Sequence, residues 1–302
     1  MRLLNNLVIA LLRITPKPVL FLFARRYISG SKLSDAVRVV KELNSKGISA
    51  TIDLLGEEVK NEGETRKVLE EYKRVVDAIV AEGLDSGISI KPTHYGLRIS
   101  KELCYRNIRE IVSYARQKGV FVCIDMEDST TTDDTLEIYE RLREEGFENV
   151  GFVLQAMLRR TLKDAQRLGK WKPVVRICKG IYKEPYEIAY HDDWVIHRNF
   201  GLVAEEIVKQ GGYPAFATHN DRMIWEALRV IHQYGLKPDQ YEFQMLYGVR
   251  ERLRDILVKE GHRVRIYVPY GEDWKPYTIR RFRENPDMLG YVIKALFTGK
   301  RT

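Results

Sequence analysis

The fold of this chain is decided by the stretch Arg263-Val-Arg-Ile-Tyr-Val-Pro-Tyr-Gly-Glu-Asp-Trp-Lys-Pro-Tyr-Thr-Ile-Arg-Arg-Phe-Arg-Glu-Asn285. Its first half alternates between apolar and polar residues, as a half-buried strand does, and its second half has the spacing of a helix. Gly271 and Pro276 mark the change from one period to the other. The stretch therefore predicts a strand that is followed by a helix.

The helical half of this stretch carries a polar face. Its members lie three or four residues apart and so share one side of the helix: Tyr277, Arg280, Arg281 and Glu284. Two adjacent guanidinium groups repel each other unless an anion lies between them, and their planar forks suit bidentate binding of a carboxylate. The alternative is a solvated basic turn. Both interpretations stay open at this point.

The strand-then-helix pattern repeats along the chain. From Lys46 onward, strand-like runs alternate with amphipathic helix-like runs, which is typical of βα units around a parallel sheet. The eight predicted strands are 49–54, 87–91, 120–126, 150–155, 173–178, 215–219, 241–245 and 264–268. We expect an α/β fold, a (βα)8 TIM barrel over residues 46–302 with an N-terminal helical segment, residues 1–45. A doubly wound sheet is the alternative, but no GxGxxG follows any strand.

Composition narrows the class of protein only slightly. The chain has 302 residues, with 44% hydrophobic and 30% charged content, which is typical of a globular protein. Fifty basic against 42 acidic residues give a net charge of +8, which suggests an anionic substrate, membrane surface or nucleic acid without choosing among them. The three cysteines lack CxxC spacing. This argues against a disulfide framework or a structural zinc site and favours a cytoplasmic protein.

The first 34 residues contain six basic residues and no acidic one. Their apolar runs, 3–12 and 19–23, are interrupted by Arg13, Pro16, Lys17 and Pro18, so neither reaches the roughly 20 residues that a membrane span needs. No small-residue cleavage motif follows the second run, which argues against a signal peptide. A basic amphipathic segment of this kind is a candidate for peripheral contact with the anionic inner face of the cell membrane. The alternative is an ordinary helix packed on the barrel.

Polar residues follow the predicted strands. In a barrel the carboxyl ends of the strands form one face, where active-site groups gather. Seven of the predicted strands end in or are followed by such groups, namely Lys91, Asp125, Gln155, Arg176 with Lys179, Thr218 with His219 and Asn220, Gln244, and Tyr267. An isolated polar residue at a strand end is usually only the start of a loop. Polar groups at seven strand ends together predict an active site at this face of the barrel.

These residues also resemble a known family, the flavin-dependent proline dehydrogenases. The matching segments are Lys91, Ile124–Asp128, Val153–Gln155, Val175–Tyr182, Phe216–Asn220, Glu242–Gln244, Arg265–Pro269 and Tyr277–Arg281 with Glu284. The match is ordered and covers most of the chain from Lys46 onward. One departure is Ile181, where the family usually has alanine, so that packing against the flavin could differ. The length looks like that of the monofunctional form.

The resemblance implies a distorted (βα)8 barrel that binds FAD non-covalently. It implies oxidation of L-proline to Δ1-pyrroline-5-carboxylate by hydride transfer from C5 to flavin N5, the first step of proline catabolism to glutamate. A membrane quinone would accept the electrons, and a separate pyrroline-5-carboxylate dehydrogenase would consume the product. No nucleic-acid partner is implied.

The resemblance also assigns roles to single residues. Asp125 and Arg176 are the catalytic candidates, and Asp125 is expected to orient Lys91 and the substrate nitrogen. The candidates for substrate binding are Lys91, Tyr267, Tyr277, Arg280, Arg281 and Glu284. The candidates for FAD binding are Met126, Gln155, Arg176, Lys179, Gly180, Ile181, Thr218, His219, Asn220 and Gln244. No metal is expected. Each assignment has a plainer alternative: Met126 as core, Gln155 as a capped strand end, and His219 with Asn220 as partners of a loop backbone.

Two other classes of protein compete with this interpretation. A Schiff-base or metal-dependent barrel lyase could use Lys91 or Lys179, because barrel architecture alone does not specify chemistry. Its acidic and imidazole groups would be Asp125, Glu127, Asp128 and His219. A basic scaffold that binds membrane or RNA would explain the charge, but it has no recognised nucleic-acid motif and leaves the polar strand ends unexplained.

Overall fold

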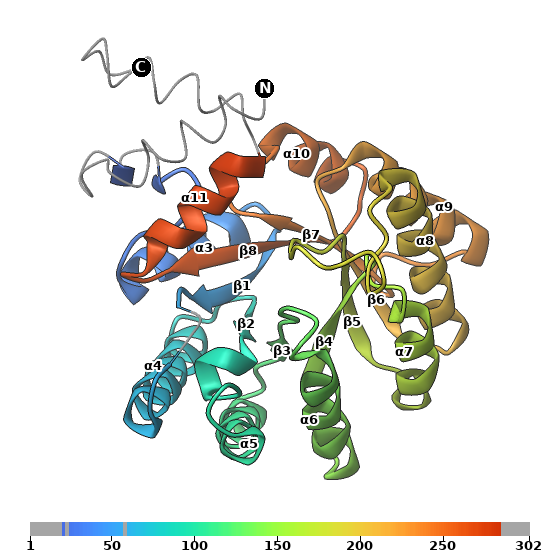
Figure 1. The fold of residues 1–302 in the computed structure, drawn as a ribbon. Helices are drawn as coiled ribbons and strands as arrows, with labels where there is room; N and C mark the ends of the chain where they lie inside the picture. The colour runs from blue at the N-terminus through green and yellow to red at the C-terminus, as the bar shows by residue number, and fades with distance from the viewer. Residues whose placement is uncertain (1–19, 22–23, 57–58, 285–302) are drawn as a thin grey trace.

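The computed structural model describes residues 20–21, 24–56 and 59–284. Eight parallel strands form one closed barrel in sequence order (Figure 1). They are β1 Ser49–Leu54, β2 Ser86–Ile90, β3 Val122–Ile124, β4 Val150–Gln155, β5 Val174–Cys178, β6 Tyr213–Ala217, β7 Glu242–Leu246 and β8 Val264–Tyr270. β8 closes the barrel by pairing with β1, with Tyr267 opposite Thr51. The predicted TIM barrel is confirmed, and the doubly wound sheet is wrong because an open sheet has two unpaired edges.

Helices surround the barrel. They are α4 Glu62–Ala81, α5 Lys101–Gln117, α6 Thr132–Glu144, α7 Thr161–Leu168, α8 Asp193–Lys209, α9 Asp221–Tyr234 and α10 Glu251–Lys259, with 3-10 turns η1 Pro92–Tyr95 and η2 Gly169–Trp171. Each buries the apolar side that its spacing predicts. In α4, for example, Val68, Tyr72, Val75, Val76 and Ile79 are buried.

Two further helices depart from the simple repeat. Helix α3, Leu33–Asn44, packs against β8 and β1, the place in the ring where the helix after β8 would otherwise lie. Helix α11, Trp274–Glu284, follows β8 (Figure 1). It is instead placed near the carboxyl end of the barrel, where its Tyr277 lines a cavity. Trp274 and Tyr277 pack in a small separate core with Leu20, Ala24, Tyr27, Ile28 and Leu55. A helix in segment 1–45 is therefore present, while residues 1–19 lie outside the described part of the chain.

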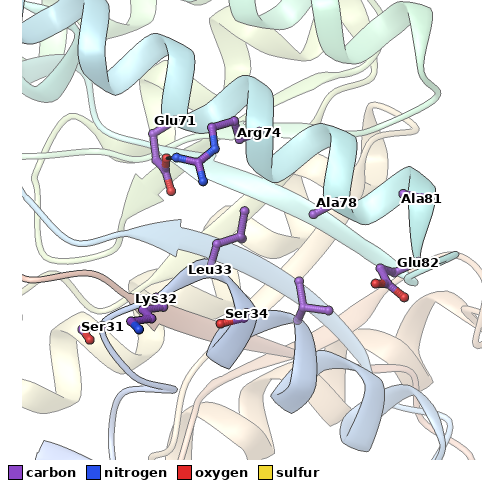
Figure 2. A pocket seen from close by; sticks show the side chains of 10 residues that line it. Ser31, Lys32, Leu33, Ser34, Glu71, Arg74, Ala78, Ala81 and Glu82 are labelled. Carbon is purple, nitrogen blue, oxygen red and sulfur yellow. Dashed lines mark hydrogen bonds and ion pairs between the residues drawn. The ribbon is translucent and has the colours of Figure 1, made fainter.

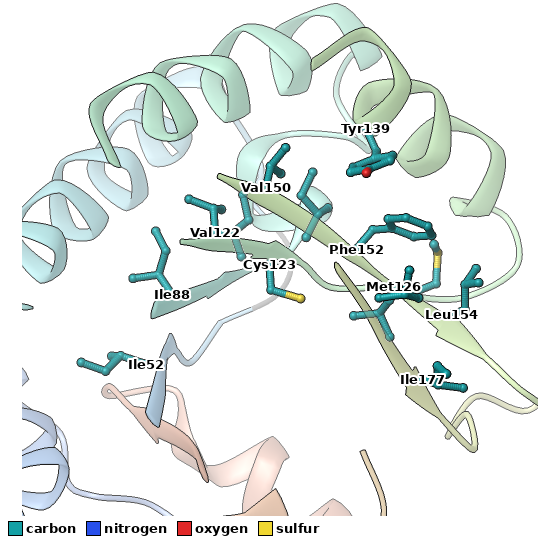
Figure 3. Packing of buried hydrophobic residues seen from close by; sticks show 14 of the residues in the cluster. Ile52, Ile88, Val122, Cys123, Met126, Tyr139, Val150, Phe152, Leu154 and Ile177 are labelled. Carbon is teal, nitrogen blue, oxygen red and sulfur yellow. The ribbon is translucent and has the colours of Figure 1, made fainter. Parts of the chain in front are cut away.

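The two faces of the barrel strands differ in polarity. Apolar side chains such as Ile52, Val150 and Ile177 belong to the buried hydrophobic layer of Figure 3. In this layer Tyr139 of α6 packs against Phe152 of β4, with ring centres 4.4 Å apart. Full burial of each such side chain contributes about 1.5–3 kcal/mol. The alternate strand positions carry polar side chains that bond to one another, and the site is built from these.

Candidate active site

A cavity of about 770 Å³ lies at the carboxyl ends of the strands. Every predicted site residue whose side chain the structure describes lines it: Lys91, Asp125, Met126, Gln155, Arg176, Lys179, Gly180, Ile181, Thr218, His219, Asn220, Gln244, Tyr267 and Tyr277. The backbone of Arg280, Arg281 and Glu284 belongs to α11, but their side chains lie outside the described part. The cavity has the size of ligand sites, roughly 300–1,000 Å³.

We call the inner part of the cavity, formed by Asp53, Lys91, Asp125, Arg176 and Tyr267, the cavity floor. Arg176, on β5, lies at its centre. Its guanidinium donates to Asp125, to Gln244 and, at 2.9 Å, to the hydroxyl of Ser89. Tyr267 donates to the other Asp125 oxygen at 2.9 Å. The Arg176 Cζ lies 5.3 Å from the centre of the Tyr267 ring. The side chains of Arg176 and Asp125 are only 9% and 13% exposed, so water and salt screen this ion pair little.

Lys91, which follows β2, holds the other side of the floor. Its ammonium pairs with Asp53 of β1. The expectation that Asp125 orients Lys91 is thus corrected, because Asp125 accepts from Arg176 and Tyr267 instead. Strand register explains the pairing. Asp53 lies opposite Ser89, and Lys91, two residues after Ser89, points to the same side of the sheet.

Burial and charge set the protonation states of the floor. Burial raises the pKa of Asp53 from 3.8 to about 6, although the Lys91 ammonium opposes the change. Burial also lowers the pKa of Lys91, but Asp53 and Asp125 more than offset this, so the pKa of Lys91 is raised overall. Burial, and then the charge of Asp125, raises the pKa of Tyr267. Lys91 is therefore an ammonium at neutral pH, whereas a Schiff-base lysine needs a lowered pKa.

A second buried network supports Arg176 from within the barrel. Gln244 accepts from Arg176 through Oε1 and donates through Nε2 to Glu242. Arg265 donates to the same Glu242 oxygen at 2.8 Å. Because a guanidinium only donates hydrogen bonds, the Gln244 amide turns its oxygen to Arg176 and its Nε2 to Glu242. The orientation of Arg176 thus depends on residues deeper in the barrel.

The loop between β5 and α8 forms an exposed rim of the cavity. Lys179 pairs with Asp193 at 2.6 Å, with side chains 45% and 65% exposed. Ile181 is 55% exposed. Gly180 has a φ of +101°, and a Cβ there would lie 2.6 Å from the Met157 side chain. This turn therefore requires glycine.

The amide and imidazole groups on the cavity wall also bond to backbone. His219 Nε2 accepts from the N–H of Leu246 at 2.8 Å, which places its ring proton on Nδ1. The Asn220 side chain caps the start of α9. Gln155 donates to the Glu127 carbonyl at 2.8 Å. These bonds match the plainer alternatives from the sequence and also hold the three side chains at the cavity wall.

A second hollow, of about 610 Å³, lies between α3 and α4 (Figure 2). Its wall combines apolar Leu33 and Ala78 with Glu71 and Arg74, which pair with each other at 2.7 Å. Glu71 also accepts from the Tyr270 hydroxyl at 2.9 Å. Glu71 and Arg74 thus satisfy each other, and Glu82, which also lines the hollow, pairs with Lys41 outside it.

Sequence reasoning missed several residues of the site. Asp53 and Ser89 lie within strands that are otherwise buried, and Glu242 begins β7. Glu127 was predicted only as a polar group after β3 and as a lyase candidate. It accepts from the backbone N–H of Thr93 at 2.8 Å and from its hydroxyl at 2.6 Å, which ties the loop after β3 to the loop after β2. Asp53 and Glu242 could have been found from the sequence, because a charged residue in an otherwise apolar strand needs a partner.

No group of three or more His, Cys, Asp or Glu side chains in the described ranges has the arrangement of a metal site. The metal-dependent lyase alternative thus gains no support from side-chain geometry. The Schiff-base version is likewise unsupported for Lys91, whose pKa is raised by Asp53 and Asp125 against the effect of burial.

Comparisons with known proteins point to one family. A sequence model of the proline dehydrogenase family matches residues 36–293. Proline dehydrogenase 1 of Bacillus subtilis subsp. natto is 41% identical over 273 residues, which are 90% of this chain and 90% of that protein. Proline dehydrogenase of Deinococcus radiodurans is 36% identical over 280 residues, 91% of this chain and 90% of that protein.

A solved structure shows the same fold. The crystal structure of proline utilization A from Bdellovibrio bacteriovorus, inactivated by N-propargylglycine, matches with a TM-score of 0.81 at 25% identity. The match covers 92% of this chain and 34% of that chain, so the present chain spans about a third of that longer protein.

Proposed function

The chain belongs to the proline dehydrogenase family, and from this membership we propose how its cavity serves the oxidation of L-proline. Its function is that of a proline dehydrogenase, an oxidoreductase of proline catabolism, and the lyase alternative is not supported. The observation that carries the proposal is the floor of the cavity, where two cations with little exposed side-chain surface, Lys91 and Arg176, are each held by a carboxylate.

FAD is the proposed cofactor, and the residues around the cavity fit it. Arg176 and Lys179 supply positive charge, Gln155, Asn220 and Gln244 supply amides, and Thr218 and His219 add further polar groups beside apolar Met126 and Ile181. Cations suit a pyrophosphate, and apolar walls suit a flat ring system. When bound, the flavin supplies at N5 the acceptor for the hydride that leaves C5 of proline. Arg176 would stabilise negative charge on the reduced cofactor.

The substrate carboxylate is proposed to bind Lys91 together with Arg280 and Arg281, with Glu284 as their counterion. Lys91 is an ammonium at the cavity floor, and its side chain is 13% exposed. The α11 backbone, which carries the two arginines, also brings Tyr277 to the cavity. Charge-assisted bonds from several directions would fix the carboxylate and hence the ring.

Asp125 and the two tyrosines shape the rest of the substrate site. Asp125 accepts from Arg176 and from the Tyr267 hydroxyl, so its carboxylate is held beside the proposed position of the substrate nitrogen. Tyr267 and Tyr277 wall the cavity. They are proposed to exclude water and to reject larger or hydroxylated rings.

Stereochemistry tests this arrangement. With an artificial electron acceptor, the purified yellow protein should oxidise L-proline and leave D-proline unchanged, because inversion at the α-carbon moves C5 when the carboxylate is fixed. Replacing Arg280 or Arg281 by Met should raise the KM for proline roughly 10- to 100-fold while flavin content stays the same. Equal rates with both enantiomers, or a KM within twofold of wild type in both variants, would refute the proposed carboxylate site.

A membrane quinone is the proposed electron acceptor, and a separate pyrroline-5-carboxylate dehydrogenase is the proposed pathway partner. Among the described residues, no helix has the length and apolar character that crossing a bilayer requires. The basic N-terminal segment is the proposed contact with the anionic inner face of the cell membrane, although its residues 1–19 lie outside the described part.

A truncation tests the membrane contact, and the structure sets its limit. Leu20, Ala24 and Tyr27 pack with α11, and Ser29 donates to the Pro269 carbonyl at 3.0 Å. The deletion should therefore end at residue 19, so that this small core stays intact. It should lower sedimentation with anionic vesicles and slow quinone reduction, while activity with a soluble acceptor is retained. Unchanged vesicle binding would show that the segment does not bind lipid.

A further inference from the structure

Asp53 is the most deeply buried charged group of the cavity. Its residue is 0% exposed. One carboxylate oxygen accepts from the Lys91 ammonium. The other, Oδ2, is buried and has no hydrogen-bond partner among the described residues. A carboxylate held in this way is unfavourable for folding, which suggests that it is retained for what it does in the site.

The groups around Asp53 explain why Lys91 is its one strong partner. Three tyrosine hydroxyls lie close to Asp53, those of Tyr72, Tyr267 and Tyr270. The Tyr267 hydroxyl lies close enough to lower the pKa of the Asp53 carboxyl against the effect of burial. Burial raises the pKa values of Tyr72 and Tyr270, and the charge of Asp53 raises them further. The hydroxyl of Tyr72 donates to the Ser89 carbonyl at 2.6 Å, that of Tyr267 to Asp125 at 2.9 Å, and that of Tyr270 to Glu71 at 2.9 Å. Among the residues that the structure describes, a further charged neighbour is Asp125, which repels Asp53.

The cavity floor thus holds two carboxylates and two cations that could pair in more than one way. Asp125 is near enough to raise the pKa of Lys91, as Asp53 does. If Lys91 moved to Asp125, it would compete with Arg176 and Tyr267 for the two Asp125 oxygens that they occupy. A lysine has a flexible stem with several rotatable bonds, so an anchoring partner is needed to select one position.

We propose that Asp53 is the positioning residue of Lys91: it holds the ammonium where the substrate carboxylate binds and keeps it away from Asp125. This inference rests on the proposed function only in taking Lys91 as a carboxylate ligand. Asp53 acts through Lys91 and does not itself contact the substrate, since its side chain is fully covered. The anchored arrangement requires Asp53 to be ionised. With a pKa of about 6, Asp53 is anionic above that pH and becomes protonated below it.

Binding of a ligand that cannot react tests this role without relying on turnover. Cyclopentanecarboxylate keeps the ring and carboxylate of proline but has no nitrogen, and its affinity for the holoenzyme can be measured by calorimetry. Asp53→Asn should weaken it about 10- to 100-fold, as expected when a buried charged contact is lost. Lys91→Met should weaken it as much. Adding Asp53→Asn to Lys91→Met should change nothing further, because a residue that acts only through Lys91 has no effect without it.

The same measurement has a pH signature that a purely structural role would not produce. In the wild type the affinity should fall as the pH drops through about 6, and in Asp53→Asn it should be weak and should lack this transition. The KM for L-proline should rise in Asp53→Asn more than kcat falls, with flavin content unchanged. If Asp53→Asn does not fold, the comparison of wild type with Lys91→Met still decides, since the transition should be absent in Lys91→Met.

The outcomes separate this inference from the proposed function. If the wild type neither oxidises L-proline nor binds the analogue, the proposed substrate site is wrong. Suppose that the wild type binds the analogue and that Lys91→Met weakens this binding. The role of Asp53 is then refuted, while the substrate site stands, if Asp53→Asn binds the analogue as tightly as the wild type. The same holds if the double variant loses the sum of the affinities that the two single variants lose.

Discussion

The floor and the rim of the cavity use the same kind of ion pair in opposite surroundings. On the floor, the Arg176–Asp125 pair is 9% and 13% exposed. On the rim, the Lys179–Asp193 pair is 45% and 65% exposed. Breaking a buried pair leaves a charge without solvent or partner, at about 3–5 kcal/mol, whereas an exposed pair contributes roughly 0–1 kcal/mol. The floor therefore holds its side chains in fixed positions, whereas the side chains of the rim can move when a ligand binds.

The largest expected effect is at Asp125. Asp125→Ala leaves the Arg176 guanidinium buried without its carboxylate, so the free energy of unfolding should fall by about 3–5 kcal/mol and proline turnover should be lost. Denaturant unfolding and kcat/KM measure the two effects. Asp133→Ala is the matched control, because Asp133 is 81% exposed beside Arg160 and should change stability by about 1 kcal/mol or less. Equal losses in both variants would contradict the contrast between buried and exposed pairs.

The pH dependence of stability should reveal the cost of Asp53. Its pKa is raised from 3.8 to about 6 by burial, so the folded protein binds this proton more tightly than the unfolded chain. The stability that the proton contributes is present below pH 3.8 and is lost as the pH rises through about 6. Relative to Asp53→Asn, the wild type should lose roughly 3 kcal/mol between pH 4 and 7. Unfolding curves of both proteins measure this, and a difference that stays constant with pH would contradict it.

The smallest expected effect is at Ile181 on the rim. Its side chain is 55% exposed, so Ile181→Ala should change the free energy of unfolding by about 0.5 kcal/mol or less. Flavin affinity should change only modestly, because the backbone at this turn is determined by Gly180, whose φ is +101°. Fluorescence titration of released flavin measures this affinity. A large loss of flavin would show that the isoleucine packs on the cofactor more closely than its exposure implies.

The strands of the barrel could be predicted because each is a short apolar run between turn residues, as in 150–155, which forms β4 as expected. The polar wall could be predicted because residues such as Lys91 and Gln155 stand at the ends of those runs. The pairing of Lys91 with Asp53 could not be predicted, since it depends on the register between β1 and β2. Asp53 itself was passed over because it lies inside an apolar run.

The placement of helices at the end of the chain was also beyond the sequence pattern. The spacing in 274–284 predicts a helix, which is present as α11. Nothing in that spacing indicates that α3 packs between β8 and β1 or that α11 is thereby placed at the cavity. Such choices depend on which surfaces remain uncovered once the barrel has closed.

One paired measurement tests the central claim that Lys91 on the floor binds the substrate and Lys179 on the rim binds the cofactor. Lys91→Met and Lys179→Met remove the same charge, from a side chain that is 13% exposed in the first case and 45% exposed in the second. Flavin stoichiometry and the KM for L-proline would be measured for both variants. We expect Lys91→Met to retain flavin and to show a KM raised roughly 10- to 100-fold, and Lys179→Met to lose flavin affinity with an unchanged KM once flavin is saturating. The opposite pattern, or the same pattern in both variants, would contradict the account.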